Sequence, residues 1–318
     1  MSFSTARVSV IIPCLNAERT LGDALDSVFA QTVRPMEVLV IDDHSTDRSA
    51  VVARKHHPSV RVLTNPSRGS GAARRLGVEQ ARGDFIAFVD ADDMIHPLKH
   101  EKQLVVLENS DPHTLVHTGA WLQWADGRQA TRQRRSAQSA TGRCMWTIFE
   151  SNPVCGASTM LRRSVILEVG NYDAALFNCA DFGMSLVAST CCDFVYLPEP
   201  LYVITRHANN VSSRKADMAY HHWLAQEKFR RRFPAAFATL PPDSIRRYMV
   251  EPVLRAVREA YWRRESVGYR RLVELAMRLA PDDPVMQRFY RRRYWPMRVL
   301  RWLDRFRGPQ AAAQPEAS

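Results

Sequence analysis

The sequence predicts an α/β fold with a Rossmann-like, mostly parallel sheet, flanking helices and a helical C-terminal extension. Over the first hundred residues, short β-branched runs alternate with longer amphipathic segments, which is the pattern of βαβ units. Polar residues follow the predicted strands, as expected where a parallel sheet binds a ligand. From Ala216 onward the pattern is helical and rich in Arg and aromatic residues.

The first four strands are separated by segments long enough for right-handed crossovers. The strands are expected at Val8–Ile12, Glu37–Asp42, Val60–Thr64 and Asp84–Asp90. The intervening helices are expected at Ala17–Gln31, Thr46–His56 and Gly71–Arg82. Consecutive strands of this kind are expected to lie parallel.

After Asp93 the alternation becomes less regular. Residues 125–142 form a polar, Arg-rich stretch with few apolar residues, interpreted as a mobile loop that closes as a lid. Further helices are expected at Pro97–Asn109, at Ser164–Val169 and from Asp181, and further strands at Leu115–Trp124, at Ala157–Arg162, near Phe194 and near Leu201.

Charge divides the chain unequally. The net charge is +11, and residues 214–308 hold 23 Lys and Arg against 10 Asp and Glu, while the remainder holds 21 against 23. Such a surplus favours an anionic partner, either a phospholipid surface or a nucleic acid. No nucleic-acid-binding module is recognisable, so we expect no nucleic-acid partner. The expected division is a domain at 1–213, a basic helical region at 214–308 and a disordered tail at 309–318.

The N-terminus lacks the pattern of a secretory signal, and no run of 18 apolar residues occurs, so a cytoplasmic location is expected. The six cysteines show neither a CxxC pair nor a His at zinc-ligand spacing. Buried free thiols are therefore expected rather than a structural metal site.

Asp90 and Asp92 follow the fourth strand. If the chain stays extended there, both carboxylates point the same way and repel unless a cation joins them. Mg²⁺ or Mn²⁺ held by one or two carboxylates and substrate phosphates would satisfy such a pair. The alternative is a solvated acidic loop that caps the helix after Pro97.

Two other polar segments admit more than one interpretation. Asp42 and Asp43 could cap the following helix, or one of them could accept hydrogen bonds from a base or ribose. Thr46 or Asp47 is the expected cap. The small residues of 69–74 enter a helix whose free amides could lie close to phosphate, although the segment has no Walker motif.

Together, these motifs resemble the inverting family 2 glycosyltransferases, over roughly residues 7–213. The matching segments, in the family's order, are Val10-Ile11-Ile12-Pro13-x-x-Asn16, Val40-Ile41-Asp42-Asp43-x-Ser45-Thr46-Asp47, Gly71-x-x-x-x-x-Gly77 and the run from Gly83 to Asp93. The resemblance implies a GT-A type fold and a nucleotide-diphosphate-sugar donor. Each segment is common alone, whereas the ordered set is specific.

On the donor side, the resemblance implies roles for six of these positions. Asp43 matches the uracil-binding aspartate, which favours a UDP-sugar, while Pro13 and Asn16 line the nucleotide pocket and Arg74 lies beside the diphosphate. Asp90 and Asp92 match the DxD motif, in which the second aspartate holds Mn²⁺ or Mg²⁺ on the diphosphate.

The resemblance also places the general base and a basic loop. Asp181 matches the base, and Arg206 with His207 matches the loop that closes over the diphosphate. Ala180 replaces the acidic first member of the usual pair, which leaves Asp173 as a less favoured base. His44 stands where Gly or Asn is usual and is compatible with a left-handed turn.

The implied activity is a single, inverting sugar transfer of hexosyltransferase type (EC 2.4) to a lipid-linked or cell-envelope glycan. The QxxRW motif of processive synthases is not visible around Gln226. A sugar nucleotidyltransferase is the first alternative, but it would carry a Gly-rich basic loop where this chain has Pro13-Cys14-Leu15-Asn16. The second alternative is a non-catalytic protein that binds sugar nucleotides or membranes.

A helix over Met297–Arg307 would place apolar residues on one face and arginines on another. Such a segment could lie in an anionic membrane interface, which would make the protein peripheral on the inner face of the cytoplasmic membrane. Alternatively, its apolar stripe packs on the catalytic domain while its arginines are solvated.

Overall fold

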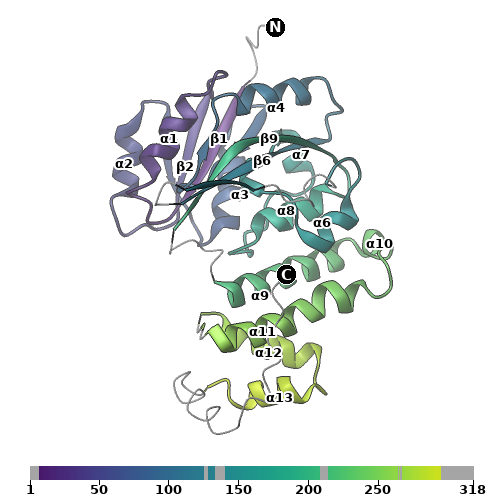
Figure 1. Cartoon of the computed structure of the whole chain (residues 1–318). Coiled ribbons are helices and arrows are strands. Elements are labelled where there is room, and N and C mark those ends of the chain that lie inside the picture. The colour runs from purple at the N-terminus through teal and green to yellow at the C-terminus, as the bar shows by residue number, and fades with distance from the viewer. Residues whose placement is uncertain are drawn as a thin grey trace. The chain divides into compact units, whose positions relative to one another are not determined.

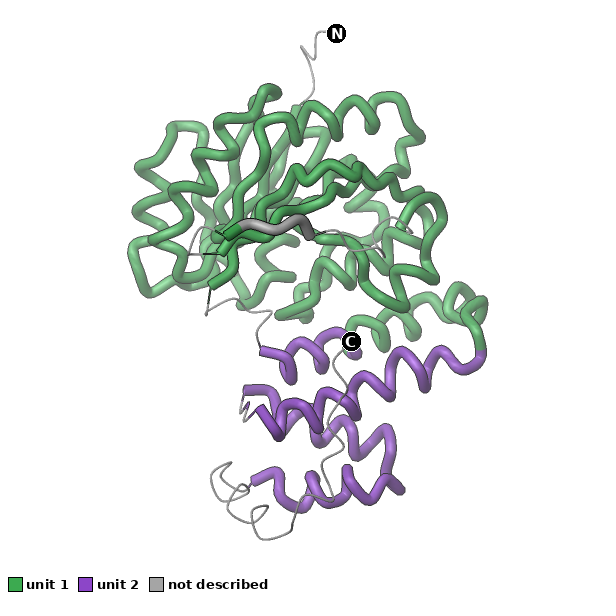
Figure 2. The backbone as a smooth tube through the Cα atoms, viewed as in Figure 1, with its two compact units in different colours: residues 1–210, 224–241 green, residues 211–223, 242–318 purple. Residues whose placement is uncertain are grey.

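The protein divides into two compact units in a computed structural model (Figure 2). The structure describes residues 7–124, 128–132, 140–207, 214–263, 265 and 267–294. Unit 1 comprises residues 1–210 and 224–241, and unit 2 comprises residues 211–223 and 242–318. Residues 224–241, expected in the C-terminal region, therefore group with unit 1. The helix expected at Met297–Arg307 lies outside the described residues.

Unit 1 is built on one sheet with the strand order β3-β2-β1-β4-β8-β6-β9-β5, and β7 pairs with β6 at its side (Figure 1). The first four strands confirm the expectation and are mutually parallel. Their bounds are Val8–Cys14 (β1), Glu37–Asp42 (β2), Val60–Thr64 (β3) and Phe85–Phe88 (β4). Buried β-branched side chains on both faces of β1 and β2 explain their central position.

The remaining strands make the sheet mixed. The strands are Met94–Ile95 (β5), Thr114–Trp124 (β6), Gln129–Arg132 (β7), Met160–Arg162 (β8) and Asp193–Arg206 (β9). β6 and β9 are parallel, whereas β4–β8, β6–β8, β6–β7 and β5–β9 are antiparallel. The two strands expected near Phe194 and Leu201 are one long strand. The expectation of a loop over residues 125–142 was wrong for residues 129–132, which form β7 and pair with β6.

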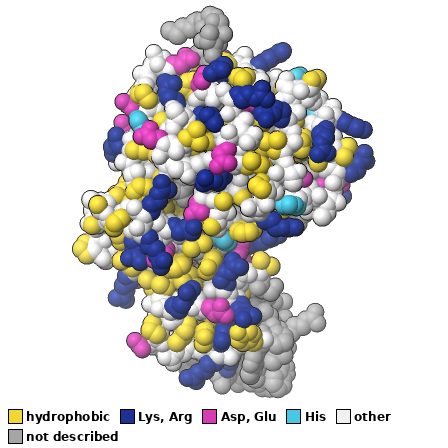
Figure 3. Space-filling model, turned by 180° about the vertical axis from the view of Figure 1, so that it is seen from behind, with side chains coloured by type: hydrophobic (Ala, Val, Ile, Leu, Met, Phe, Trp, Pro, Cys, Tyr) yellow, Lys and Arg dark blue, Asp and Glu magenta, His cyan; other side chains and the backbone are white. Residues whose placement is uncertain are grey.

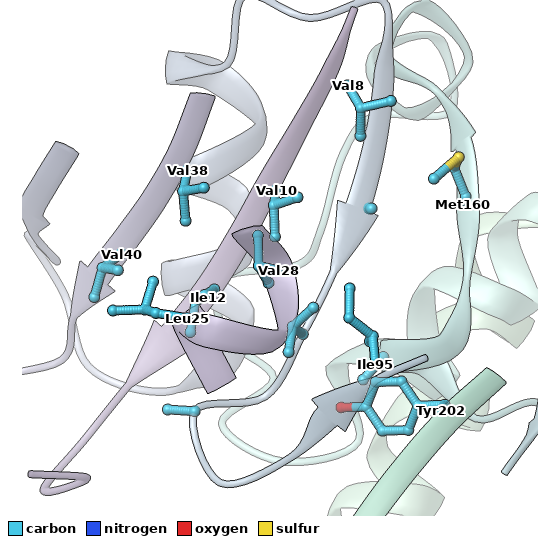
Figure 4. Packing of buried hydrophobic residues seen from close by; sticks show 14 of the residues in the cluster. Val8, Val10, Ile12, Leu25, Val28, Val38, Val40, Ile95, Met160 and Tyr202 are labelled. Atoms are coloured by element: carbon cyan, nitrogen blue, oxygen red, sulfur yellow. The ribbon is translucent and has the colours of Figure 1, made fainter. Parts of the chain in front are cut away.

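Helices cover both faces of the parallel half of the sheet (Figures 1 and 4). Alternate residues of β1 and β2, such as Val10, Ile12 and Val40, pack with Leu25 of α1 (Leu21–Phe29) and Leu104 of α4 (Lys99–Glu108). On the other face, α3 (Ser70–Gln80) brings Gly77 against Ile11, where a β-carbon would clash. The other helices after β2 and before β9 are α2 (Ser49–His56), α6 (Met145–Ser151), η1 (Gly156–Ser158), α7 (Arg163–Glu168) and α8 (Ala180–Ala188).

Unit 2 has its own apolar core. α9 (Lys215–Arg232) begins in unit 2 and ends in unit 1, where α10 (Pro234–Phe237) follows. The helices η3 (Ile245–Val250), α11 (Glu251–Arg263), α12 (Tyr269–Leu279) and α13 (Pro284–Arg291) then complete unit 2. Val257, Leu272 and Met286 are fully buried among them. The apolar stripes of α11, α12 and α13 thus pack on one another.

The arginines of these helices lie mainly on the outside, as Arg255, Arg258, Arg270 and Arg278 show. On the face in Figure 3, Lys and Arg side chains are scattered among apolar and acidic ones. Among the described residues, we find no helix with the length and apolar character needed to cross a bilayer.

Candidate active site

The nucleotide side of the site is formed by the loops after β1 and β2. Asn16 adopts a left-handed conformation with a φ of 51°. Its side-chain oxygen accepts a hydrogen bond from the backbone amide of Thr46 at 2.8 Å. Its backbone amide donates to the Ser45 hydroxyl at 3.0 Å. Asn16 therefore joins the two loops. His44 also adopts the left-handed conformation, with a φ of 64°, with which its position in the sequence is compatible.

Asp43 is buried, and two neighbours orient its carboxylate. It accepts hydrogen bonds from Asn65 Nδ2 at 2.7 Å and from the Gly69 amide at 2.9 Å. Pro13 lies in β1 opposite Ile41 of β2, two residues before Asp43. These contacts bring Pro13, Asn16 and Asp43 together at one end of the parallel strands.

The amides of Gly69, Ser70 and Gly71 at the start of α3 are hydrogen-bonded within the protein, so the expectation that they are free to meet a phosphate was wrong. The Ser70 and Gly71 amides each donate at 3.2 Å, to the carbonyl oxygens of Phe177 and Leu176. The Gly69 amide is bonded to Asp43. Gly69 has a φ of 100°, and a β-carbon there would meet Phe177. The segment before α8 thus occupies the position that the sequence suggested for a ligand.

Arg74, on α3, forms an ion pair with Asp90, and its Nη2 lies 2.7 Å from Asp90 Oδ1. The Arg74 side chain is only 8% exposed, whereas that of Asp90 is 38% exposed. Burial raises the pKa of Asp90, Arg74 opposes this, and the nearby charges of Asp92 and Asp181 raise it further. Burial also disfavours the charge on Arg74, but Asp90 and Asp181 outweigh it and raise the pKa of Arg74.

The chain does not stay extended from Asp90 to Asp92, contrary to the expectation. β4 ends at Phe88, and the Asp93 amide donates to the Asp90 carbonyl at 3.0 Å, which closes a turn. The two carboxylates therefore diverge. Asp90 faces Arg74, whereas Asp92 Oδ2 lies 2.8 Å from His207 Nε2.

Asp92 and His207 fit a divalent cation. Ligand atoms at adjacent positions of an octahedral ion lie about 3 Å apart when the bonds are about 2.1 Å long. The two side chains hydrogen-bond to each other at 2.8 Å, which holds them close to that spacing, and a bound cation would replace this hydrogen bond. Carboxylates suit Mg²⁺ and Mn²⁺, and neutral imidazole is a common ligand of metal ions in general. Among the described residues, no group of three or more His, Cys, Asp or Glu side chains could hold a metal, so the other ligands would come from substrate and water.

Asp181 lies in the first turn of α8, which begins after Cys179 in a left-handed conformation. A β-carbon on Gly156 would clash with the Asp181 side chain, so η1 fixes this aspartate at close range. The charge of Asp181 contributes to the raised pKa of both Arg74 and Asp90. Asp173 is instead bound to Lys228 Nζ at 2.7 Å, a contact that disfavours it as the base.

Sequence reasoning missed the residues that hold the Asp90–Asp93 turn. The Tyr202 hydroxyl donates to Asp93 Oδ2 at 2.9 Å and accepts from the Asp90 amide at 3.1 Å. The Thr205 amide donates to Asp93 Oδ1 at 2.8 Å. Burial, with the charges of Asp90 and Asp92, raises the pKa of Asp93 well above its usual value. The third acid of Asp-Ala-Asp-Asp was the only local signal for this network. Arg206, predicted with His207, lies at the end of β9 in register with Trp124.

A family model described as glycosyl transferase family 2 matches residues 9–170, just over half of the chain. The chain belongs to this family. The uncharacterized glycosyltransferase YibD of Escherichia coli (strain K12) is 37% identical over 114 residues, which cover 35% of this chain and 33% of that protein. The uncharacterized glycosyltransferase EpsJ of Bacillus subtilis (strain 168) is 35% identical over 126 residues, covering 38% of this chain and 36% of that protein. The chain thus matches about a third of the length of these relatives.

Solved structures share the fold over most of the chain. Staphylococcus aureus TarS 1-349 in complex with UDP-GlcNAc has a TM-score of 0.56 at 17% identity, covering 95% of this chain and 91% of that one. The mannosyltransferase PcManGT of Pyrobaculum calidifontis, in complex with GDP-Man and Mn²⁺, has a TM-score of 0.55 at 16% identity, covering 94% and 87%. At this identity the likeness establishes the GT-A fold, as the resemblance implied.

Proposed function

We propose that this protein is an inverting glycosyltransferase that moves one sugar from a nucleoside-diphosphate sugar to an acceptor hydroxyl. One observation carries the proposal. Asp90 pairs with Arg74, Asp92 pairs with His207, and the charge of Asp181 acts on Asp90, and these contacts and charges between three separate parts of the chain support a single site. This arrangement provides a cation position and a carboxylate base together.

The donor would lie along the ends of the parallel strands. Pro13, Asn16 and Asp43 would line the base and ribose position, and the orientation of Asp43 by Gly69 and Asn65 supports that role. A carboxylate held in this way can accept a hydrogen bond from the N–H of a uracil. We therefore favour a UDP-sugar.

Asp181 would act as the general base. Its carboxylate would take the proton of the acceptor hydroxyl as that oxygen attacks the anomeric carbon and the bond from this carbon to the diphosphate oxygen breaks. Attack from the face opposite the leaving group inverts the configuration in one displacement. The proximity of Gly156 limits how far Asp181 can move, which favours a fixed position for the base.

Asp92 and His207 would hold the divalent cation, and Arg74 would keep Asp90 oriented beside it. A bound Mn²⁺ or Mg²⁺ would supply charge stabilisation for the departing diphosphate. Arg206, next to His207 at the end of β9, would add a second positive charge there. His207 thus moves from a diphosphate contact, as the resemblance implied, to a proposed cation ligand.

We propose a lipid-linked or cell-envelope glycan as the acceptor, with the basic C-terminal region meeting an anionic membrane surface. The charge surplus of residues 214–308 supports this partner. The apolar stripes of α11, α12 and α13 pack on one another and are buried. The arginines of these helices, rather than their apolar stripes, would therefore contact the lipid.

Calorimetry with UDP, dTDP and GDP, each with Mn²⁺ or with EDTA, tests the donor site directly. We expect UDP to bind in the presence of Mn²⁺ and to lose most of its affinity in EDTA. Preferential binding of dTDP or GDP would replace UDP as the donor nucleotide. If none of the three binds under either condition, the proposed activity is wrong.

A further inference from the structure

We propose that Tyr202 and Asp93 are positioning residues that set the spacing between Asp92 and His207. The inference rests on the proposed role of that pair as cation ligands. It assigns a function in the site to two side chains that do not themselves face a ligand, since Tyr202 is fully buried and Asp93 is 6% exposed.

Three hydrogen bonds fasten the Asp90–Asp93 turn to β9. The Tyr202 hydroxyl takes part in two of them, with the Asp90 amide and with Asp93 Oδ2. The other oxygen of Asp93 accepts from the Thr205 amide. The turn is therefore bonded at both of its ends, on either side of Asp92.

The same contacts fix the position of His207. β5 begins at Met94, directly after the turn, and pairs with β9 so that Met94 faces Val203 and Ile95 faces Tyr202. The ring of Tyr202 lies beside Ile95 in the core (Figure 4). Thr205, which Asp93 holds, is two residues before His207. Asp93 thus ties together the two segments that carry the proposed ligands.

Core stability alone does not account for this network. A carboxylate buried beside two other acids is destabilising, and apolar side chains would fill the same space at lower cost. Groups that hydrogen-bond to the ligands of a metal commonly strengthen metal binding. Removing one of them typically weakens metal affinity by about 10- to 100-fold. The network between Asp90, Asp93, Tyr202 and Thr205 is placed to have this effect.

The test is Mn²⁺ binding by Tyr202→Phe, measured by electron paramagnetic resonance in the presence of UDP, because the diphosphate is expected to supply further ligands. Tyr196→Phe is the matched control, because it removes one hydroxyl from the same strand at a residue paired with His117. We expect Tyr202→Phe to weaken Mn²⁺ affinity by about 10- to 100-fold. Tyr196→Phe should bind as the wild type does. A thermal melt of each protein establishes the folded fraction.

Three outcomes overturn the inference, and they are distinguishable. If the wild type binds no Mn²⁺ in the presence of UDP, the proposed cation site itself fails. If Tyr202→Phe binds with wild-type affinity, only the positioning role fails. If it melts earlier and shows fewer sites per chain at unchanged affinity, the network is structural only.

Asp93→Asn approaches the same network from its other side and serves if Tyr202→Phe does not fold. It should also weaken Mn²⁺ binding. Because the two residues act through one hydrogen bond, the double variant should lose less affinity than the two single losses combined. Fully additive losses would contradict the proposal.

Discussion

The two sides of the site differ in how their polar groups are satisfied. On the nucleotide side, the carboxylate of Asp43 and the amide of Asn16 are bonded to neighbours of complementary character. On the cation side, Asp90, Asp92 and Asp93 lie within four residues, and the pKa values of Asp90 and Asp93 are raised by burial and by one another. The polar groups of the nucleotide side are satisfied by hydrogen bonds, whereas the cation side gathers three acids at close range, with Arg74 and His207 as the partners of two of them.

The difference indicates what each side binds. A site whose polar groups are already oriented recognises a ligand by its shape and through the hydrogen bonds that those groups can still make. Crowded carboxylates gain most from a positive charge, which removes their repulsion. The comparison therefore predicts that nucleotide recognition and cation binding can be lost separately.

The largest effect is expected between the two sides, at Asp181. Asp181→Asn keeps the size of the side chain and removes the base, so transfer should fall by about 10² to 10⁴-fold. Donor binding, measured by calorimetry, should be retained, because Asp181 is not among the proposed ligands of the nucleotide or of the cation. Turnover at the wild-type rate would exclude Asp181 as the base.

On the cation side, we expect Asp92→Ala to weaken Mn²⁺-dependent nucleotide binding by at least about 10-fold, since it removes a ligand rather than a residue around one. The residual binding in EDTA should equal that of the wild type. Calorimetry in both conditions makes the measurement. Equal losses with Mn²⁺ and with EDTA would show that Asp92 contacts the nucleotide directly.

On the nucleotide side, Asp43→Ala should have the opposite signature. It should weaken nucleotide binding by a similar factor with Mn²⁺ and with EDTA, while Mn²⁺ binding alone is retained. It should also destabilise the fold by about 1–3 kcal/mol, because the Gly69 amide and Asn65 lose their acceptor. Chemical denaturation measures this cost, and an unchanged stability would contradict the orienting role of these bonds.

The smallest functional effect is expected at Lys99, a buried charge outside both sides. Its Nζ has no hydrogen-bond partner, and burial lowers its pKa from 10.5 to about 7. The folded state therefore binds this proton less tightly than the unfolded state, and its contribution to stability rises as the pH rises from about 7 to about 10.5.

Lys99→Met should remove this pH dependence. We expect it to stabilise the protein near pH 7 by on the order of 2 kcal/mol, with transfer activity unchanged. Denaturation at several pH values checks the first expectation and turnover the second. If Lys99→Met is stable but less active, then Lys99, although it lies outside both sides of the site, has a function that accounts for its unfavourable burial.

Much of the parallel half of unit 1 could be predicted from local sequence. β2 and β3 have the predicted bounds. In β2, the run from Val38 to Ile41 favours a strand that is buried on both faces. Asp43, Asp90 and Asp92 were recognised because they follow such strands. The small residues of 69–71 led to a wrong prediction of a phosphate contact. Their backbone amides suit a phosphate, but in the structure those of Ser70 and Gly71 bind the carbonyls of Phe177 and Leu176.

By itself, the sequence determined the parallel strands and helices of the first ninety residues and the acids at their ends, since both follow from periodicities that a few residues express. The short strand β5 was not predicted. Tertiary structure alone decided which distant groups share the site. The order β4-β8-β6-β9-β5 brings His207 to Asp92 and Tyr202 to Asp93. Contacts across more than a hundred residues depend on how strands pair and helices pack, and no local pattern encodes that arrangement.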